Sequence, residues 1–310
     1  MDPVRDLLEK VEEERMRHWL FHLSKDPIPF RKLNYSVPGH VKSTLHEADD
    51  WIEEQLRSFG YDTEREACQV QAFGFDPNKP KHSAYAPTPP GAPFYTAYNI
   101  YAKKVGKERR DKAILLLAHK DSQSWIDSPG AYDNCVGTVA VLEMARTLTS
   151  YENECTLLFL FCNEEHTPWT SIRAAENFAL RGLNLVALFN LDGLGGKGEE
   201  DIAADRKTNV TLYTTPEGKR LADLMAKVND FYKIGLVQTS FQRPYPNDDD
   251  GSFVKAGYPS SVANIGSFPY SDPQYHLEGD VPERVDITNV RMATQATLAA
   301  VLWLDRNMKW

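Results

Sequence analysis

Ala113-Ile-Leu-Leu-Leu-Ala-His119-Lys-Asp121-Ser122 is the stretch around which the rest of the sequence is interpreted, together with Gly130-Ala-Tyr-Asp133-Asn-Cys-Val-Gly137, which follows it. An apolar run this short, with charged residues before it and polar residues after it, is typical of a buried parallel strand. Because side chains alternate along a strand, His119 and Asp121 should point the same way at its carboxyl end, and Lys120 should point away. A carboxylate beside an imidazole fixes the tautomer of the ring and raises its basicity, as a metal site requires. The second stretch places Asp133 at the start of a helix.

The composition indicates a globular protein, with 42% hydrophobic and 11% aromatic residues among 310. A formal net charge of −9 argues against nucleic acid or an anionic membrane as the main partner. No apolar run is long enough to span a membrane. The charged N-terminus lacks the apolar segment of a signal peptide, which predicts a cytoplasmic protein, although a secreted chain that has lost its leader would look the same. The four cysteines form no C-x-x-C pair and are expected to be free thiols: Cys68, Cys135, Cys155 and Cys162.

The order of the expected elements predicts an α/β fold with a doubly wound, mostly parallel central sheet and helices on both faces. Strands are expected at residues 68–73, 97–103, 113–118, 155–161, 185–191 and near 260–263. Helices are expected at residues 3–24, 43–59, 134–148, 171–180, 216–231 and 287–304. A loop rich in proline, glycine and aromatic residues separates the first two strands, from Asp76 to Pro93. The sequence shows no internal repeat and no clear linker, so we expect a single domain over 1–310 with an N-terminal helical arm at about 1–25.

Residues of the kind that bind metals follow each central strand of the predicted sheet. In open α/β sheets, functional side chains gather at the carboxyl ends of the strands. Each of these residues has an ordinary explanation when taken alone, and an aspartate before a helix is usually an N-cap. Together they are harder to dismiss, because paired acids after an apolar strand are costly to cluster unless cations neutralise them. The set comprises His119, Asp121, Asp133, Glu164, Glu165, Asp192 and the later His276.

A charge count favours two divalent cations among these residues. Two such ions bring about four positive charges, which the carboxylates of Asp133, Glu165 and Asp192 and a bridging hydroxide would balance. His119 and His276 would add neutral nitrogen donors, and a mixed nitrogen and oxygen set suits zinc, with manganese or cobalt as alternatives.

Five segments of the chain, taken together, resemble a known family. The sequence is similar, from about Gly39 to the C-terminal helix, to the di-zinc metallopeptidases that include bacterial leucyl-type aminopeptidases and glutamate carboxypeptidases, whose fold glutaminyl cyclases share. The order and spacing of the segments fit the family pattern, which implies a zinc-exopeptidase-like fold and hydrolysis of peptide bonds. The matching segments are Ala118–Ser122, Gly130–Gly137, Asn163–Glu165, Asn190–Asp192 and Tyr275–Asp286.

The resemblance also implies a set of metal ligands. His119 and Asp192 would be the terminal ligands of one zinc ion. Glu165 and His276 would be the terminal ligands of the other, and Asp133 would bridge the two ions.

Two further roles and two departures follow from the same comparison. Asp121 would orient His119, and Glu164 would be the catalytic base that takes a proton from the attacking water and passes it to the leaving amine. Asp250 stands where the family usually has a histidine, and His166-Thr-Pro-Trp169 stands where it usually has small residues. Both departures border the expected substrate site, and His166 itself is expected on the surface or in the core, with a place in the site as the alternative.

We expect the substrate to be a peptide or a small aminoacyl compound. Acidic residues suit a free α-amine and arginine suits a carboxylate, and here Asp248 to Asp250 outnumber Arg243, which favours an aminopeptidase. One alternative is a glutaminyl cyclase-like aminoacyltransferase with a single zinc. Another is a catalytically inactive relative that serves in binding. The intact set of five ligands favours the two-metal enzyme, and the sequence carries no sign of an oligomeric state.

Overall fold

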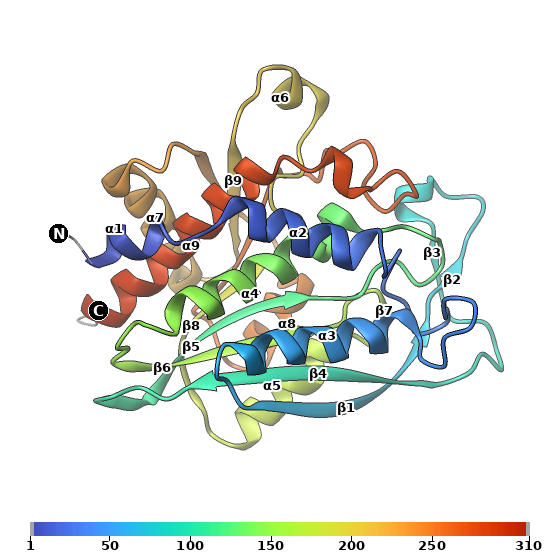
Figure 1. Ribbon diagram of the computed structural model, residues 1–310, viewed down its shortest axis with the longest axis horizontal. Coiled ribbons are helices and arrows are strands. Elements are labelled where there is room, and N and C mark those ends of the chain that lie inside the picture. Colours follow the sequence, from blue (N-terminus) through green and yellow to red (C-terminus); the bar gives the residue numbers. More distant parts are fainter. Residues whose placement is uncertain (1–2, 308–310) are drawn as a thin grey trace.

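A nine-stranded mixed sheet with helices on both faces forms the centre of the computed structural model, which describes residues 3–307 (Figure 1). The strand order is β10-β9-β11-β8-β5-β6-β4-β1-β7. The parallel centre consists of β5 (Arg109–His119) between β6 (Cys155–Cys162) and β8 (Asn184–Leu191), with β11 (Ser261–Ile265) beside β8. The outer strands β4 (Tyr95–Lys104), β1 (Thr63–Ala72), β7 (His166–Thr167) and β9 (Thr208–Tyr213) each run antiparallel to their inner neighbour. The predicted fold class is confirmed.

Helices bury both faces of the central strands. The face formed by α3 (Thr44–Ser58), α4 (Val136–Leu148), α7 (Pro216–Tyr232) and α9 (Ile287–Asn307) contains Ile114, Leu116 and Ala118 of β5. The opposite face, under α5 (Thr170–Leu180) and α8 (Asp248–Lys255), contains Ala113, Leu115 and Leu117. Because both faces of β5 are covered, its sequence is a continuous apolar run instead of an alternating one.

The N-terminal segment differs from the single helix expected over 3–24. It forms two helices, α1 (Pro3–Leu8) and α2 (Glu13–Ser24), and the backbone N–H of Glu12 at the break donates to Glu143 Oε1 of α4 at 2.8 Å. Leu7, Leu8 and Val11, before the break, belong to the same apolar core as α9. The assignment of a single domain over 1–310 stays a prediction. Residues 1, 2 and 308–310 lie outside the part of the chain that the structure describes.

Several short elements were not predicted. The polar segment after β8 contains α6 (Glu199–Ala203), which projects at the top of Figure 1, and the strand β9, whose polar residues hide its strand character. The edge strand β10 (Val237–Gln242) is almost entirely exposed, so it has no alternation of apolar residues. In the expected loop, β2 (Gly74–Phe75) pairs with β3 (Tyr85–Ala86), and a 3-10 turn, η1 (Lys81–Ser83), lies between them. The last such turn, η3, covers Pro282–Arg284.

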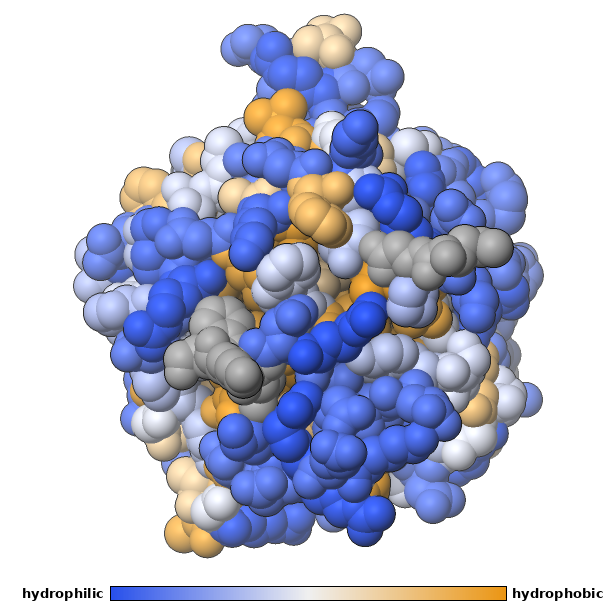
Figure 2. Space-filling model, turned by 90° about the vertical axis from the view of Figure 1, so that its left-hand side faces the viewer, coloured by the Kyte–Doolittle hydropathy of each residue, from blue (hydrophilic) through white to orange (hydrophobic). Residues whose placement is uncertain are grey.

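Figure 2 shows the face of the molecule that forms the left-hand side of Figure 1, and this face is largely polar. Hydrophilic side chains cover most of this face, and hydrophobic ones appear in smaller areas between them. Within residues 3–307, no helix combines the length and the apolar character needed to cross a bilayer. The four cysteines are free, as expected.

Lys120 leaves β5 on the side opposite to His119 and is fully buried. Its Nζ lies 2.8 Å from Asp49 Oδ1 of α3 and donates to Asn163 Oδ1 at 2.7 Å. Burial raises the pKa of Asp49 above its usual value, although the charge and hydrogen bond of Lys120 oppose the shift. The expected orientation of Lys120 is therefore confirmed, and the residue anchors α3 to the sheet.

Replacing Lys120 by Met should lower the free energy of unfolding by about 3–5 kcal/mol near neutral pH, because Asp49 is left as an uncompensated buried charge. The loss should shrink as the pH falls toward about 5. The pKa of Asp49 in the folded protein lies above its unfolded value of about 3.9, so protonation of Asp49 stabilises the folded protein as the pH falls. Urea unfolding at the two pH values measures both effects. The double variant Lys120→Met/Asp49→Asn is the matched control and should recover stability at neutral pH. Equal losses in both variants would contradict this account.

Candidate metal and catalytic site

The five predicted metal ligands meet in one cavity at the carboxyl ends of the central strands. His119 ends β5, Glu165 follows β6 and Asp192 follows β8, while Asp133 lies in the short turn η2 (Ala131–Cys135) before α4 and His276 comes from a loop. All five side chains are buried. They line a cavity of about 300 Å³, whose other lining residues are Phe73, Tyr85, Glu164, Trp169, Asn247, Asp248 and Tyr275.

Asp133 lies between the two histidines. Its Oδ1 is 3.1 Å from His119 Nε2, and its Oδ2 is 2.7 Å from His276 Nε2. On one side Asp192 Oδ1 lies 3.4 Å from His119 Nε2, and on the other Glu165 Oε1 lies 3.6 Å from His276 Nε2. The two oxygens of one carboxylate thus face two separate pairs, each made of a histidine and an acidic residue. This is the arrangement that a bridging ligand and two terminal pairs require.

The backbone around Asp133 leaves its carboxylate free for this role. Asp133 was expected to start the helix, but α4 starts at Val136 and Asp133 has an extended backbone (φ −120°, ψ 92°). Asn134 Oδ1 accepts the N–H of Gly137 at 2.9 Å and so performs the capping that an aspartate often performs. Gly130 precedes this turn with a φ of +59°, and a Cβ there would lie 2.4 Å from the backbone oxygen of Asp133.

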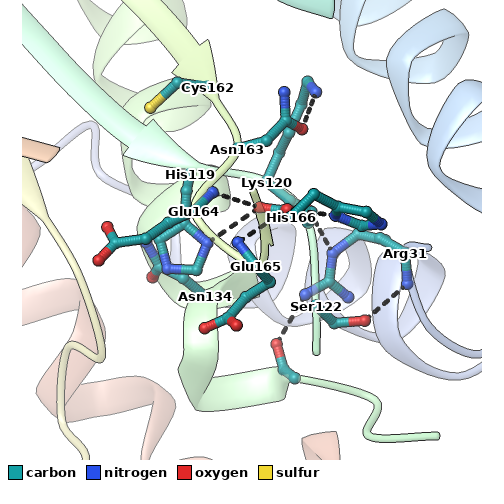
Figure 3. Close-up of polar contacts among 12 residues, drawn as sticks. Arg31, His119, Lys120, Ser122, Asn134, Cys162, Asn163, Glu164, Glu165 and His166 are labelled. Atoms are coloured by element: carbon teal, nitrogen blue, oxygen red, sulfur yellow. Dashed lines mark hydrogen bonds and ion pairs between the residues drawn. The ribbon is translucent and has the colours of Figure 1, made fainter. Parts of the chain in front are cut away.

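Asp121 links the segments that follow β5 and β6 through contacts with Glu164, Glu165 and His166, which are labelled in Figure 3. Its carboxylate accepts the backbone N–H groups of Glu164 and Glu165, both at 2.9 Å, and the Nδ1–H of His166 at 2.8 Å. His119 Nδ1 lies 3.3 Å from the same carboxylate. Burial raises the pKa of Asp121, but hydrogen bonds from His119 and His166 hold it well below its usual range. Asp121 therefore positions Glu164 and Glu165 as well as His119. His166 is buried in the core and does not line the cavity.

Arg31 ties the same loops from the other side (Figure 3), and no sequence pattern indicated it. The fully buried guanidinium donates from Nε to the backbone oxygen of Lys120 at 2.6 Å, and from its terminal nitrogens to those of Pro129 and Gly130, both at 2.8 Å. A fourth bond reaches the backbone oxygen of Leu23 at 2.6 Å. The segment after His119 is thereby linked to the turn before Asp133.

The acidic groups of the cavity are poorly compensated by the protein itself. Burial, together with Asp133, raises the pKa of Glu165 to about 8. Burial, together with Asp249 and Asp248, raises the pKa of Glu164 well above its usual range. Cations beside these carboxylates would favour their ionised forms.

The donor set fits such cations. Glu164 Oε2 and Asp192 Oδ1 are buried and accept no hydrogen bond from the residues that the structure describes. Buried polar atoms of this kind are rare unless an ion or water satisfies them. Nitrogen and oxygen donors suit zinc, and here they form two trios. Within each trio the donor atoms lie within 4.8 Å of one another: His119, Glu164 and Asp192 in one, and Asp133, Glu165 and His276 in the other.

Three contacts with the ligands come from residues outside the predicted set. Tyr270 donates its hydroxyl to Asp192 Oδ2 at 3.0 Å, and Tyr85 donates its hydroxyl to Glu165 Oε2 at 2.7 Å. The backbone oxygen of His82 lies 2.7 Å from Nδ1 of the ligand histidine at position 276. No sequence pattern indicated the partners of either tyrosine.

The residue that departs from the family pattern, Asp250, does not line the cavity. It is buried and pairs with Arg243, which also donates to Asp248 Oδ2 at 2.7 Å. Asp248 does line the cavity, and its backbone is left-handed (φ +59°), which costs a residue with a side chain of order 1 kcal/mol or more. Asp250 thus helps to hold Arg243 in place, and Arg243 in turn holds Asp248 in the cavity.

Comparison with known proteins identifies relatives of this chain in sequence and in fold. The profile described as Peptidase family M28 matches residues 99–301, more than half of the chain. Leucine aminopeptidase 1 of Leptosphaeria maculans is 25% identical over 313 residues, which cover 97% of this chain and 72% of that protein. A zinc aminopeptidase from Bacillus subtilis has a similar fold, with a TM-score of 0.69, 16% identity and 96% of each chain covered. So has a glutaminyl cyclase from Bacteroides thetaiotaomicron, with a TM-score of 0.71, 16% identity and coverage of 94% of this chain and 97% of that one.

Proposed function

This chain belongs to peptidase family M28, and we propose that it is a metal-dependent aminopeptidase that removes N-terminal residues from peptides with two zinc ions in its cavity. One observation supports this choice among exopeptidases. Apart from the five proposed ligands, the charged side chains that line the cavity are Glu164 and Asp248, both acidic. A free α-ammonium group would find counter-charges there, whereas the carboxylate of a carboxypeptidase substrate would find no cationic side chain in the described lining.

Arg243 does not change this balance. Its terminal nitrogens are bound to Asp248 and Asp250, and one of them also donates to the backbone oxygen of Asn247 at 2.9 Å. One guanidinium is therefore shared by two carboxylates, and the group of Arg243, Asp248 and Asp250 retains a net negative charge.

The chemistry follows from the positions of the side chains. When bound, the two zinc ions would polarise the peptide carbonyl and lower the pKa of the attacking water. His119 and Asp192 would hold one ion, Glu165 and His276 the other, and Asp133 both.

Glu164 is the remaining acid at the reacting centre. Its carboxylate lies in the trio with His119 and Asp192, and its backbone is fixed by Asp121. In this position Glu164 takes the proton of the attacking water and then gives it to the nitrogen of the leaving amine. Burial raises its pKa, which makes it a stronger base once it is ionised beside the cations.

A panel of aminoacyl-nitroanilides, N-acetylated dipeptides and peptides with N-terminal Gln, run with and without a chelator, tests the proposal. We expect chelator-sensitive hydrolysis that requires a free α-amine. Cyclisation of the Gln peptides with release of ammonia, at one zinc per chain, would instead establish the cyclase alternative. No turnover with any substrate would favour the binding relative.

Replacing Asp248 by Asn should raise KM for aminoacyl-nitroanilides by about tenfold, the size of one lost charge-assisted hydrogen bond. The isosteric amide can accept only one of the two bonds that the carboxylate accepts, from Asn247 Nδ2 to Oδ1 at 2.9 Å or from Arg243 to Oδ2 at 2.7 Å, so thermal unfolding of the variant is the control for an intact cavity. Steady-state kinetics with and without N-acetylation of the substrate is the measurement. An equal effect on acetylated substrates would show that Asp248 does not recognise the amine.

A further inference from the structure

We propose that the segment from Gly74 to Ala86, which carries β2, η1 and β3 and is here called the covering loop, positions both terminal ligands of one metal ion and sets the affinity of that site alone. This inference rests on the two-metal site of the proposed function. The covering loop lies outside residues 99–301, to which the family profile matches. It lies at the right-hand side of Figure 1, beside the carboxyl ends of the strands.

The covering loop is held in a defined shape. Gly74 pairs with Ala86 and Phe75 with Tyr85, and the N–H of Asp76 donates to the backbone oxygen of Ala84 at 2.8 Å. Aromatic contacts fix Tyr85 from two sides: its ring meets Phe73 edge to face at 4.9 Å and Trp125 at 6.0 Å between centroids. The loop can therefore place its groups at a fixed position relative to the cavity.

Tyr85 determines which oxygen of Glu165 is available to a metal. Gln123 Nε2 donates to the hydroxyl oxygen of Tyr85 at 2.7 Å, so the single hydroxyl proton is directed to Glu165 Oε2, also at 2.7 Å. Oε2 is thereby occupied, and Oε1 is left facing His276 Nε2. A ligand held in this way loses less freedom when the ion binds.

His82 does the same for the histidine of this site. Its backbone oxygen lies 2.7 Å from His276 Nδ1 and can only accept a hydrogen bond, so it fixes the proton on Nδ1. Nε2, which faces Asp133 Oδ2 at 2.7 Å, is then the nitrogen that gives up its proton when a metal ion binds. The ring of Tyr85 meets the ring of His276 edge to face at 5.5 Å, which limits its rotation.

The other metal pair is supported by different elements. Asp121, at the end of β5, lies 3.3 Å from His119 Nδ1, and Tyr270 donates to Asp192 Oδ2 at 3.0 Å. Within residues 3–307, no hydrogen bond, ion pair or ring contact joins the covering loop to His119 or Asp192. The two ions should therefore respond separately to changes in the two tyrosines.

Titration of the metal-free protein with zinc, competed against a fluorescent chelator, tests this inference. Two binding events are expected in the natural protein. Tyr85→Phe should weaken one of them about tenfold or more and leave the other unchanged, and Tyr270→Phe should weaken the other one. Tyr101→Phe is the matched control, because its hydroxyl makes a bond of the same length, 2.7 Å, to Glu66 away from the cavity lining, and it should alter neither event.

Each outcome is decisive. If Tyr85→Phe weakens neither event, or both equally, the inference is wrong. A single event in the natural protein would overturn both the inference and the two-metal site. Two events that respond as expected, without any peptide hydrolysis, would support the inference and refute the proposed activity. Gln123→Leu is a second variant that leaves the tyrosine in place, and it should reproduce the selective effect if Tyr85→Phe unfolds the protein.

Discussion

Replacing Glu164 by Gln is expected to lower kcat by about 100- to 10,000-fold, the range over which a positioned general base accelerates a reaction. The amide cannot take a proton from water or return one to the leaving amine. It has nearly the same shape, so KM should change much less than kcat. The effect is attributable to proton transfer because Glu164 is not one of the five proposed ligands.

Metal content is the control for this variant. Glu164→Gln should retain two zinc ions per chain, because His119 and Asp192 keep their places on one side and Asp133 is unaffected. The metal-free variant should be at least as stable as the metal-free natural protein near neutral pH. The raised pKa of Glu164 means that its ionisation in the folded protein costs stability as the pH rises above the unfolded value, and glutamine has no such cost. Unchanged turnover with two bound ions would assign the base role to another residue.

Three of the proposed ligands could be located from the sequence because regular structure places them: His119, Glu165 and Asp192 lie at or just after strand ends, whereas Asp133 and His276 lie in irregular segments and received their roles from the family resemblance. The alternation of side chains continues past the end of β5, so His119 and Asp121 lie on one side and Lys120 on the other, and the parallel arrangement brings the ends of β5, β6 and β8 to one edge. These consequences depend on short apolar runs that are visible locally. The same reasoning explains why the central strands and most of the helices that cover them were predicted, whereas α8, which begins in a run of three aspartates, was not.

The groups that hold the ligands could not be found in this way. Tyr85 and Glu165 are 80 positions apart, and His82 and His276 are 194 apart, so no local pattern connects them. The contact of His276 is also made to a backbone oxygen, whose position depends on the fold and not on the residue type at position 82. Arg31 shows the same limit, since it binds four backbone oxygens and no acidic residue identifies its partners in the sequence.

The polar outer strands were missed for a different reason. The residues of β10 face solvent, so burial does not restrict them to an apolar pattern, and only their hydrogen bonds to β9 make them a strand. The break between α1 and α2 likewise depends on Glu143 of a helix far away in the sequence. In each case tertiary contacts decide the local structure.

Replacing Asp133 by Ala is expected to abolish binding of both zinc ions, whereas Asp192→Ala and Glu165→Ala should each weaken one ion and retain most of the other. Asp133 is the only described carboxylate whose two oxygens each lie within 3.1 Å of a different ligand histidine. Its removal leaves each ion with one histidine and one terminal carboxylate, and it brings the two cations together without the anion between them.

Zinc per chain after dialysis, measured for the three variants in parallel, gives the pattern that tests this role. The metal-free Asp133→Ala protein should also be less stable than the metal-free natural protein. Burial raises the pKa of Asp133, but the charges and hydrogen bonds of His276 and His119 more than reverse that shift, so the ionised carboxylate stabilises the fold. Zinc should raise the unfolding temperature of the natural protein strongly and that of Asp133→Ala hardly at all, since stabilisation by a ligand grows with its affinity for the folded state. If Asp133→Ala still retains one ion as firmly as Asp192→Ala does, Asp133 is a ligand of a single metal and the two sites are independent.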